Sequence, residues 1–257
     1  MRWAASLIIV AACCFADAAN AERLVASLSN HRVAITSNFV GEDLVLFGAI
    51  EPDASTQQVG NYYDVVVTVV GPRQTFRTRR KARMLGIWMN VDTREFVRVP
   101  SYLAVLSNRP FNAIAGEDTL RKLQIGLDNF LLTQRVGPDI ADTVREDPFR
   151  VAFVALESDA ALYTENVDAV TFLTPTVFRA AIPLPARVPV GNYDIDVKLF
   201  ANGEQVGRTT TTLEIIKAGF EEYVAQAARD HGFLYGLATA ALALLTGWFA
   251  SVVLRRD

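Results

Sequence analysis

Cysteine and histidine are nearly absent from this chain. Its two cysteines, Cys13 and Cys14, lie close to the N-terminus, and its two histidines, His31 and His231, lie far apart. A chain without a thiol beyond residue 14 has no means of forming a disulfide framework or a zinc site with cysteine ligands. We therefore expect a fold held by its hydrophobic core, with no cofactor and no metal.

An excess of positive charge and recognisable catalytic motifs are lacking as well. The chain has 25 Lys and Arg against 28 Asp and Glu, a net charge of -3, which argues against a nucleic-acid partner. Nucleophile elbows, phosphate loops and dinucleotide fingerprints do not occur. We expect no enzyme. A hydrolase formed by Asp and Glu residues of distant segments is the alternative that spacing alone does not exclude.

A long charge-free run is present at the C-terminus. Residues 233–254 carry no charge, and Arg255, Arg256 and Asp257 follow them. At about 1.5 Å per residue this run gives about 33 Å of helix, enough to cross a hydrocarbon core of about 30 Å. The run predicts a transmembrane helix over 233–254, a juxtamembrane helix over 218–232 and a cytoplasmic tail over 255–257.

The N-terminus has the pattern of an export signal. Arg2 precedes an apolar stretch, and Ala19-Asn20-Ala21 supplies small residues for cleavage, so residues 1–21 are predicted to be a signal peptide. Val10 to Cys13 also resembles a degenerate lipoprotein box, which would leave a lipidated Cys13. With the basic C-terminus, this predicts a single-pass protein of the bacterial inner membrane, with its N-terminal domain in the periplasm and its C-terminus in the cytoplasm.

Residues 22–217 have the alternation of short β-strands. Tyr193, Ile195, Val197 and Leu199 alternate with polar residues, and Asn202-Gly203 is a strong hairpin signal. The returning strand needs a shift of one residue to bury its apolar side chains, which predicts a bulge at Gly207. The position of Tyr193 suggests a corner tyrosine whose hydroxyl bonds back to the chain.

A helical segment interrupts the strands over about 111–166. One helix is expected over 116–134, and a second begins with Asp147 as N-cap and Pro148 at the first position. Its apolar stripe is Phe149, Phe153, Leu156 and Ala160. The predicted fold is mainly β: an immunoglobulin-like β-sandwich ectodomain with an inserted α-helical segment, followed by one C-terminal transmembrane helix. Two domains joined near Pro110 are the alternative.

Two sets of residues are candidate interaction sites. The basic run, an anion-facing surface that would meet lipid head groups, an acidic partner or an exported anion, consists of Arg73, Arg77, Arg79, Arg80, Lys81 and Arg83. Cations on a solvated edge strand are the competing interpretation, since they discourage pairing between edges. Small residues at four-residue spacing form the second set, a helix-packing stripe of Gly232, Gly236, Ala240, Ala243, Gly247 and Ser251.

The chain also resembles the predicted single-pass membrane proteins of alphaproteobacteria, a family without an assigned function. The matching segments include Glu22 to Val25, Ile35 to Phe39, Val99 to Val105, Ser107 to Pro110, Val188 to Tyr193 and Leu234 to Leu237. The resemblance implies a membrane protein, suggested to accompany exporters of small sulfur compounds or anions. It brings no catalytic residue.

Two hypotheses on function follow from these patterns. The first is a non-catalytic periplasmic accessory module, anchored in the lipid bilayer and docked on a polytopic membrane protein such as a transporter. The second is a periplasmic sensor domain that binds an anion or another ligand at the basic run. Self-association through the stripe of small residues would give a homo-oligomer.

Overall fold

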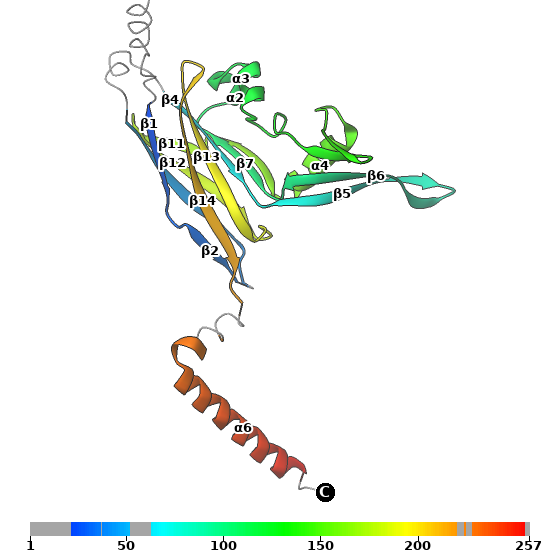
Figure 1. Cartoon of the computed structure of the whole chain (residues 1–257), viewed down its shortest axis with the longest axis vertical. Coiled ribbons are helices and arrows are strands. Elements are labelled where there is room, and N and C mark those ends of the chain that lie inside the picture. The colour runs from blue at the N-terminus through cyan, green and yellow to red at the C-terminus, as the bar shows by residue number, and fades with distance from the viewer. Residues whose placement is uncertain (1–21, 37, 52–62, 220–223, 225–227, 255–257) are drawn as a thin grey trace, which may run out of the picture.

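Strands dominate the described part of the chain, and they form three sheets (Figure 1). The structure is a computed structural model, and it describes residues 22–36, 38–51, 63–219, 224 and 228–254. The predicted signal peptide with Cys13, residues 220–223 and 225–227 of the predicted juxtamembrane helix, and the tail 255–257 lie outside the described residues. The mainly β character expected from the sequence is confirmed.

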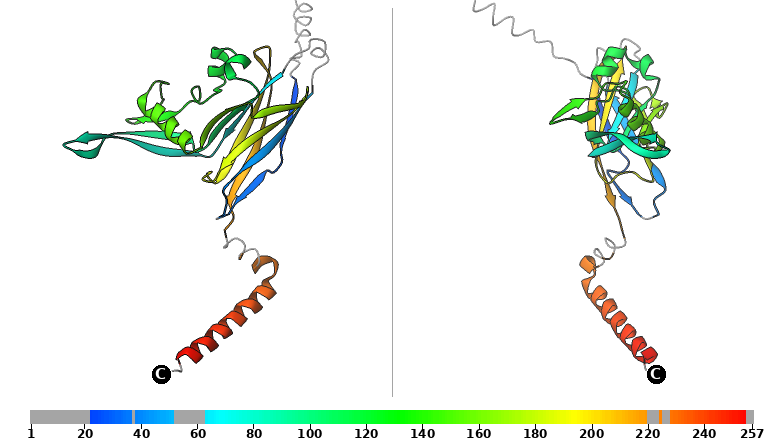
Figure 2. Two further views of the ribbon diagram at one scale, coloured as in Figure 1. Left: turned by 180° about the vertical axis from the view of Figure 1, so that it is seen from behind. Right: turned by 90° about the vertical axis from the view of Figure 1, so that its right-hand side faces the viewer.

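Two of the sheets pack face to face as a sandwich (Figure 2). The first has the order β1 (Arg23–Leu28), β3 (Gly41–Glu51), β12 (Val177–Pro185), β11 (Val170–Thr174). The second has the order β10 (Tyr163–Val167), β7 (Leu103–Ser107), β4 (Tyr63–Val70), β13 (Gly191–Ala201), β14 (Glu204–Lys217), β2 (Arg32–Ile35). Early strands β3 and β4 pair with late strands β12 and β13, so both sheets join segments from the two ends of the β region.

The sandwich core follows from strict alternation along its strands. On β13 the side chains of Tyr193, Ile195, Val197 and Leu199 are all buried, as the sequence predicts. β12 buries every second residue in the same way from Phe178 onward. Alternation of this kind leaves one face of each strand apolar, and burial of that face is the main favourable term in folding.

The turn after β13 and the shift in β14 also match the sequence. Asn202 and Gly203 both have positive φ, which a type I′ turn requires. Leu199 lies opposite Gly207 and the next pair is Phe200 with Gln205, so the extra residue is Val206 rather than the expected Gly207. Gly207 stays paired because a Cβ there would lie 3.3 Å from the Glu22 carbonyl oxygen.

Three buried tyrosines donate hydrogen bonds to carbonyl oxygens of prolines. The pairs are Tyr102 with Pro183, Tyr163 with Pro100 (2.7 Å) and Tyr193 with Pro189 (2.5 Å). The last is the corner predicted from the sequence. Burial is the main cause that raises the pKa of all three hydroxyls above the ordinary tyrosine value. Each tyrosine thus stays neutral. The hydrogen bond from the Tyr102 hydroxyl to Pro183 joins the two sheets of the sandwich.

The third sheet grows out of the second one. It has the order β5 (Arg73–Met84), β6 (Ile87–Pro100), β8 (Thr133–Val136), β9 (Asp139–Asp142). β4 continues into β5 through Gly71 and Pro72, and β6 continues into β7 through Ser101 and Tyr102. The Gly71 amide donates to the Tyr102 carbonyl (2.8 Å), and the Ser101 amide donates to that of Pro72 (2.9 Å). Strands β4 and β5 on one side and β6 and β7 on the other therefore form one continuous, bent ribbon. Its β5–β6 part, called the arm from here on, projects from the sandwich (Figure 1).

Aromatic rings fix the base of the arm. Phe76 of β5 and Phe96 of β6 lie with ring centroids 5.4 and 4.8 Å from that of Phe153 on α4 (Pro148–Asp159). Arg94 of β6 lies 3.3 Å from the carboxylate of Asp147. Asp147 caps α4, as predicted, by accepting from the amides of residues 149 and 150. Leu156 is exposed, so the predicted apolar stripe on this helix ends at Phe153.

The helix expected over 116–134 is wrong. The structure has two short helices, α2 (Phe111–Ile114) and α3 (Glu117–Lys122), and the end of the expected helix is strand β8. Gln124 and Gly126 take positive φ, which a right-handed helix does not accommodate. The turn between them buries Ile125 against Val66 and Val105 of the second sheet. Tertiary burial therefore outweighs helical spacing in this segment.

The predicted transmembrane helix is also corrected by the structure. α6 (Gly232–Leu254) forms where it was expected and has 23 residues. Among the residues described, however, no helix combines the length and the apolarity that crossing a membrane requires. The expectation depended on the absence of charge alone. Small and hydroxyl-bearing residues such as Gly236, Thr239, Thr246 and Gly247 gain little by transfer from water to lipid.

We predict that Gly71→Ala destabilises the fold at the bend of the ribbon. An added Cβ would lie 2.8 Å from the Tyr102 Cβ and 3.0 Å from the Tyr193 ring. We expect the free energy of unfolding to fall by about 1–3 kcal/mol, as overpacking of a filled core does, in urea unfolding followed by circular dichroism. Gly116→Ala is the matched control, because a Cβ there meets nothing within 4 Å. Equal stability of the two variants would contradict the tight bend.

Candidate functional site

The basic run lies along β5, at the edge of the third sheet, and its members have different surroundings. Arg73 lies at the base of the arm and lines a cavity. Arg77 is 3.5 Å from the carboxylate of Glu95 on β6. The edge position agrees with the interpretation that these cations discourage pairing, but five of the six extend along a projecting arm. The structure therefore separates Arg73 from the rest of the run.

The outer cations of the run are unpaired. Within the described part of the chain, Arg79, Arg80 and Lys81 make no hydrogen bond and no ion pair, and Arg83 contacts only the Gly86 carbonyl (3.3 Å). Trp88, opposite Arg83 in the register, is 67% exposed. Tyr102, at the base of the arm, is by contrast fully buried.

The stripe of small residues on α6 faces no neighbour among the residues that the structure describes. A Cβ added at Gly232, Gly236 or Gly247 would meet nothing within 4 Å. Ala240, Ala243 and Ser251 are exposed as well. The packing role of these six residues therefore stays a prediction about a partner that the single chain does not contain.

A polar cavity of about 540 Å³ lies on the outer face of the second sheet. The segment around Ile125 packs on Val66 of β4, Val105 of β7 and Phe200 of β13. The cavity lies beside it, where residues 122–124 face β13 and β14. Thr68, Asp196 and Thr210 are neighbours across β4, β13 and β14. The cations that line it are Arg73, Lys122, Lys198 and Arg208.

In this cavity the Asp196 carboxylate is paired with two cations. Asp196 accepts from Lys198 and from the Arg208 Nε (2.7 Å). This hydrogen bond, which Arg208 donates to Asp196, is the main cause that raises the pKa of the Arg208 guanidinium. By contrast, the buried Thr68 hydroxyl has no partner among the described residues. Asp194 and Asp196, two residues apart on β13, both line the cavity, where ion pairing leaves Asp196 unsuited to act as a general base.

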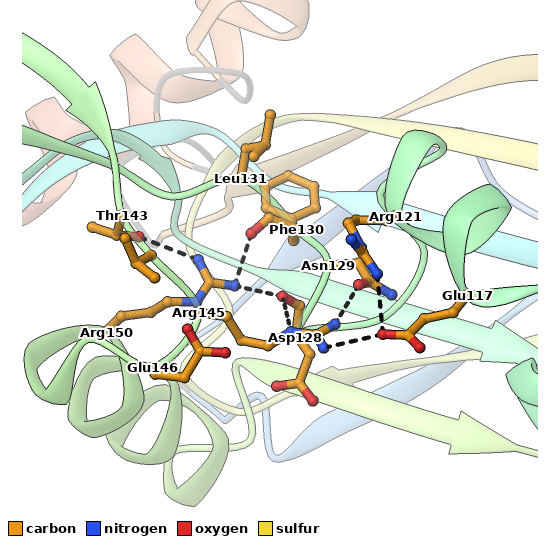
Figure 3. Close-up of a pocket in the computed structure, with 11 residues that line it drawn as sticks. Glu117, Arg121, Asp128, Asn129, Phe130, Leu131, Thr143, Arg145, Glu146 and Arg150 are labelled. Carbon is orange, nitrogen blue, oxygen red and sulfur yellow. Dashed lines mark hydrogen bonds and ion pairs between the residues drawn. The ribbon is translucent and has the colours of Figure 1, made fainter.

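A second cavity, of about 390 Å³, surrounds a buried arginine (Figure 3). Arg150 of α4 donates from one guanidinium nitrogen to the carbonyl oxygens of Leu127, Asp128 and Phe130, at 2.9–3.1 Å. A second nitrogen lies 3.3 Å from the Thr143 hydroxyl. Burial is the main cause that lowers the pKa of this guanidinium below its ordinary value. The loop around residues 127–130 has no regular secondary structure, and the Arg150 side chain supplies the donor for its carbonyl oxygens instead.

Sequence analysis missed Arg150 altogether. Its only signal is an arginine in the first turn of an amphipathic helix, next to Phe149, on the side that packs inward. Around it, Glu117 pairs with Arg121 (3.2 Å) and lies 3.9 Å from Arg145, so the outer charges of this cavity compensate one another (Figure 3). The arrangement suits a structural clasp better than a reactive centre, because its strongest donor is saturated.

Metal ligands are not gathered anywhere in the described residues, since no group of three or more His, Cys, Asp or Glu side chains could hold an ion. His31 and His231 are both exposed. Neither cavity therefore carries a recognisable catalytic constellation.

The sequence model of one protein family matches residues 23–256, nearly the whole chain. Its description is "Putative transmembrane protein (Alph_Pro_TM)". This chain belongs to that family. No characterised protein matches it in sequence. Membership in the Alph_Pro_TM family confirms the resemblance seen in the sequence and indicates a membrane location, while its description names no activity.

We predict that Arg150 acts through stability. Arg150→Leu removes a donor from three carbonyls, of which that of Asp128 also accepts from the Arg145 Nε (3.3 Å). We therefore expect the free energy of unfolding to fall by about 2–4 kcal/mol, and Arg150→Lys to recover only part of it because an ammonium lacks the planar fork. Urea unfolding measures both. Arg121→Leu is the control and should change stability by less than about 1 kcal/mol, because it removes an exposed pair. An unchanged stability of Arg150→Leu would refute the clasp.

Proposed function

We propose that this protein is a non-catalytic accessory module of the alphaproteobacterial cell envelope. In this proposal the sandwich faces the periplasm at the inner membrane, and α6 docks on a polytopic membrane protein such as a transporter. Membership in a family described as transmembrane supports a membrane location. The observation that carries the proposal is the unpartnered apolar surface of α6.

That surface consists of several large side chains. The exposed apolar side chains of α6 include Phe233, Leu237, Leu242, Leu244, Leu245, Trp248 and Phe249. Leaving such side chains in water is unfavourable, and exposed apolar patches of this kind mark sites of interaction. The hydroxyls of Thr239 and Thr246 bond back to carbonyls of their own helix, so they do not oppose burial (2.9 and 2.6 Å).

The sandwich supports an interaction role rather than a catalytic one. The Asp196 carboxylate is paired with two cations and the Arg150 guanidinium is saturated, so neither cavity offers a free acid and base in contact. What the molecule presents instead is a rigid body with two protruding apolar elements, the tip of the arm and α6. Exposed apolar surfaces on a rigid body are typical of binding modules.

We predict that α6 is the contact with the partner. A photocrosslinking amino acid at Leu244 should yield one adduct with a polytopic membrane protein in native membranes, whereas the same group at Val40, an exposed residue of the sandwich, should not. Gly236→Leu with Gly247→Leu should lower the yield at least about tenfold if small residues allow close packing. Ala241→Leu, off the stripe, is the control.

Two outcomes would contradict this prediction. The first is an adduct that contains only a second copy of this chain, which would make α6 a self-association element. The second is crosslinking to lipid alone from Leu244 in membranes that hold the full set of cellular proteins.

A second candidate function is anion binding in the polar cavity. Two observations favour it: Arg73 and Lys122 line the cavity without an ion pair among the described residues, and the Thr68 hydroxyl there has no partner. Cations and a free donor at one concave surface suit an anion that also accepts hydrogen bonds. The rest of the basic run lies outside this cavity. Of the six cations in the run, only Arg73 therefore belongs to the proposed anion site.

Calorimetric titration with phosphate or sulfate tests this second candidate. Arg73→Gln with Lys122→Gln should weaken binding at least about tenfold, since each cation near an anion contributes about 1 kcal/mol. The control is Arg179→Gln with Arg187→Gln, which removes two exposed cations from the opposite side of the sandwich. Identical titrations for both double variants would exclude the cavity as an anion site.

A further inference from the structure

The apex of the arm carries a residue that its backbone does not favour. The turn between β5 and β6 consists of Leu85 and Gly86, both with positive φ (50° and 85°). Asn or Gly is preferred at the first position of such a turn, because a branched side chain is strained in the left-handed region. Leu85 is also completely exposed. Because the Leu85 side chain buries no surface within the fold, a contact with another molecule would explain why a leucine stands at this position.

The register of the ribbon sorts the residues behind the apex onto two faces. Met84 lies opposite Ile87, and Ala82 lies opposite Met89, which gives one apolar face. On the other face Arg83 lies opposite Trp88, and Lys81 lies opposite Asn90. Met84, Ile87 and Met89 are all more than half exposed. The tip, defined here as residues 79–92, is an amphipathic hairpin that none of the described residues covers.

Cations surround this apolar end. Arg79, Arg80, Lys81 and Arg83 lie within six residues of the apex, and only one carboxylate, that of Asp92, belongs to the tip. Asp92 is bound to the amide of Thr93 (2.8 Å) and forms no ion pair with the cations in the structure described. The tip therefore combines a strong positive charge with an exposed apolar end.

Protection of an edge strand explains only half of this pattern. Lys and Arg on β5 would discourage pairing with another edge. Exposed Leu85, Ile87 and Trp88 at the apex have the opposite effect, because they favour association. An account of the tip must include both the cations and the apolar apex.

We propose that the tip of the arm binds the surface of an anionic lipid bilayer. Leu85 and the face of Met84, Ile87 and Met89 enter the boundary between head groups and acyl chains. Trp88 lies at head-group level, where tryptophan is enriched. The four cations contact phosphates of anionic lipids, with their long stems beside the apolar face. This contact is separate from the docking of α6 and does not depend on it.

The order of residues along the arm favours lipid over a protein partner. The apex is apolar, and the next part of the arm carries the aromatic and basic side chains. A bilayer shows the same order of polarity from its acyl chains outward to its head groups. A protein surface would require a matched shape, whereas the tip offers a protruding apex with flexible methionine and arginine side chains. Charge complementarity to anionic head groups then supplies the attraction.

Tryptophan fluorescence of the full chain tests this proposal. Trp3→Phe with Trp248→Phe leaves Trp88 as the only tryptophan, because the chain has three. This protein is added to preformed vesicles of phosphatidylcholine, with or without phosphatidylglycerol, whose acyl chains are brominated. We expect quenching and a blue shift of Trp88 in the anionic vesicles and much less in the neutral ones. The signal reports the tip even where α6 also associates with lipid.

Two variants separate the lipid contact from folding. Leu85→Asn suits the turn better, so it should keep or raise the stability while weakening the quenching several-fold. Arg79→Glu with Arg80→Glu should raise the lipid concentration for half-maximal quenching at least about tenfold. Arg179→Glu with Arg187→Glu makes the same change of charge on exposed sandwich residues and should have little effect.

The proposal is overturned by any of four results. Trp88 emission that stays at the wavelength found in water when anionic vesicles are added would reject it, and so would equal quenching in neutral and anionic vesicles. Unchanged binding by Leu85→Asn and by the Arg79, Arg80 double reversal together would also reject it. Quenching that appears only when a membrane protein is co-reconstituted would assign the tip to a protein partner instead. The crosslinking from α6 can succeed or fail independently of each result.

Discussion

The bend between β4–β7 and β5–β6 is the constraint on which the arrangement of this molecule depends. One antiparallel ribbon leaves the sandwich there without losing its pairing, since amides on both sides bond across the bend. Gly71 is needed because the Tyr102 and Tyr193 side chains fill the space where a Cβ would lie. The bend directs the arm outward, opens the margin where the polar cavity forms and provides the floor on which α4 packs.

Buried polar groups tie together parts of the fold that no disulfide joins in the described residues. Tyrosine hydroxyls bond to proline carbonyls at the junction of the sheets, at the corner before β13 and at the root of the arm. Arg150 holds a loop by its carbonyls, and Asp147 orders the start of the same helix while it contacts Arg94 of the arm. The bonds of Tyr102, Tyr163 and Arg150 and the pair of Asp147 with Arg94 join segments that are distant in sequence, so together they restrict how the sandwich, the helices and the arm lie.

Patterns of local origin were predictable, and those that depend on distant contacts were not. Alternation identified β13, Asn202-Gly203 identified its turn, and Asp147-Pro148 identified the start of α4. The helix expected over 116–134 failed because burial of Ile125 on a distant sheet outweighed the spacing of leucines. The transmembrane assignment failed because absence of charge was equated with apolarity. The basic run was found, but its division between a cavity and an exposed tip depends on the bend, which nothing in its own sequence reveals.

Continuity of the ribbon sets how the length of the arm can vary. Because side chains alternate with a period of two, inserting a residue pair into both β5 and β6 moves the apex outward by roughly 7 Å and keeps every side chain on its face. A single inserted residue would exchange the two faces between the insertion and the apex. Reach can therefore change among relatives in discrete steps without disturbing the sandwich, provided that Gly71 and Tyr102 stay in place.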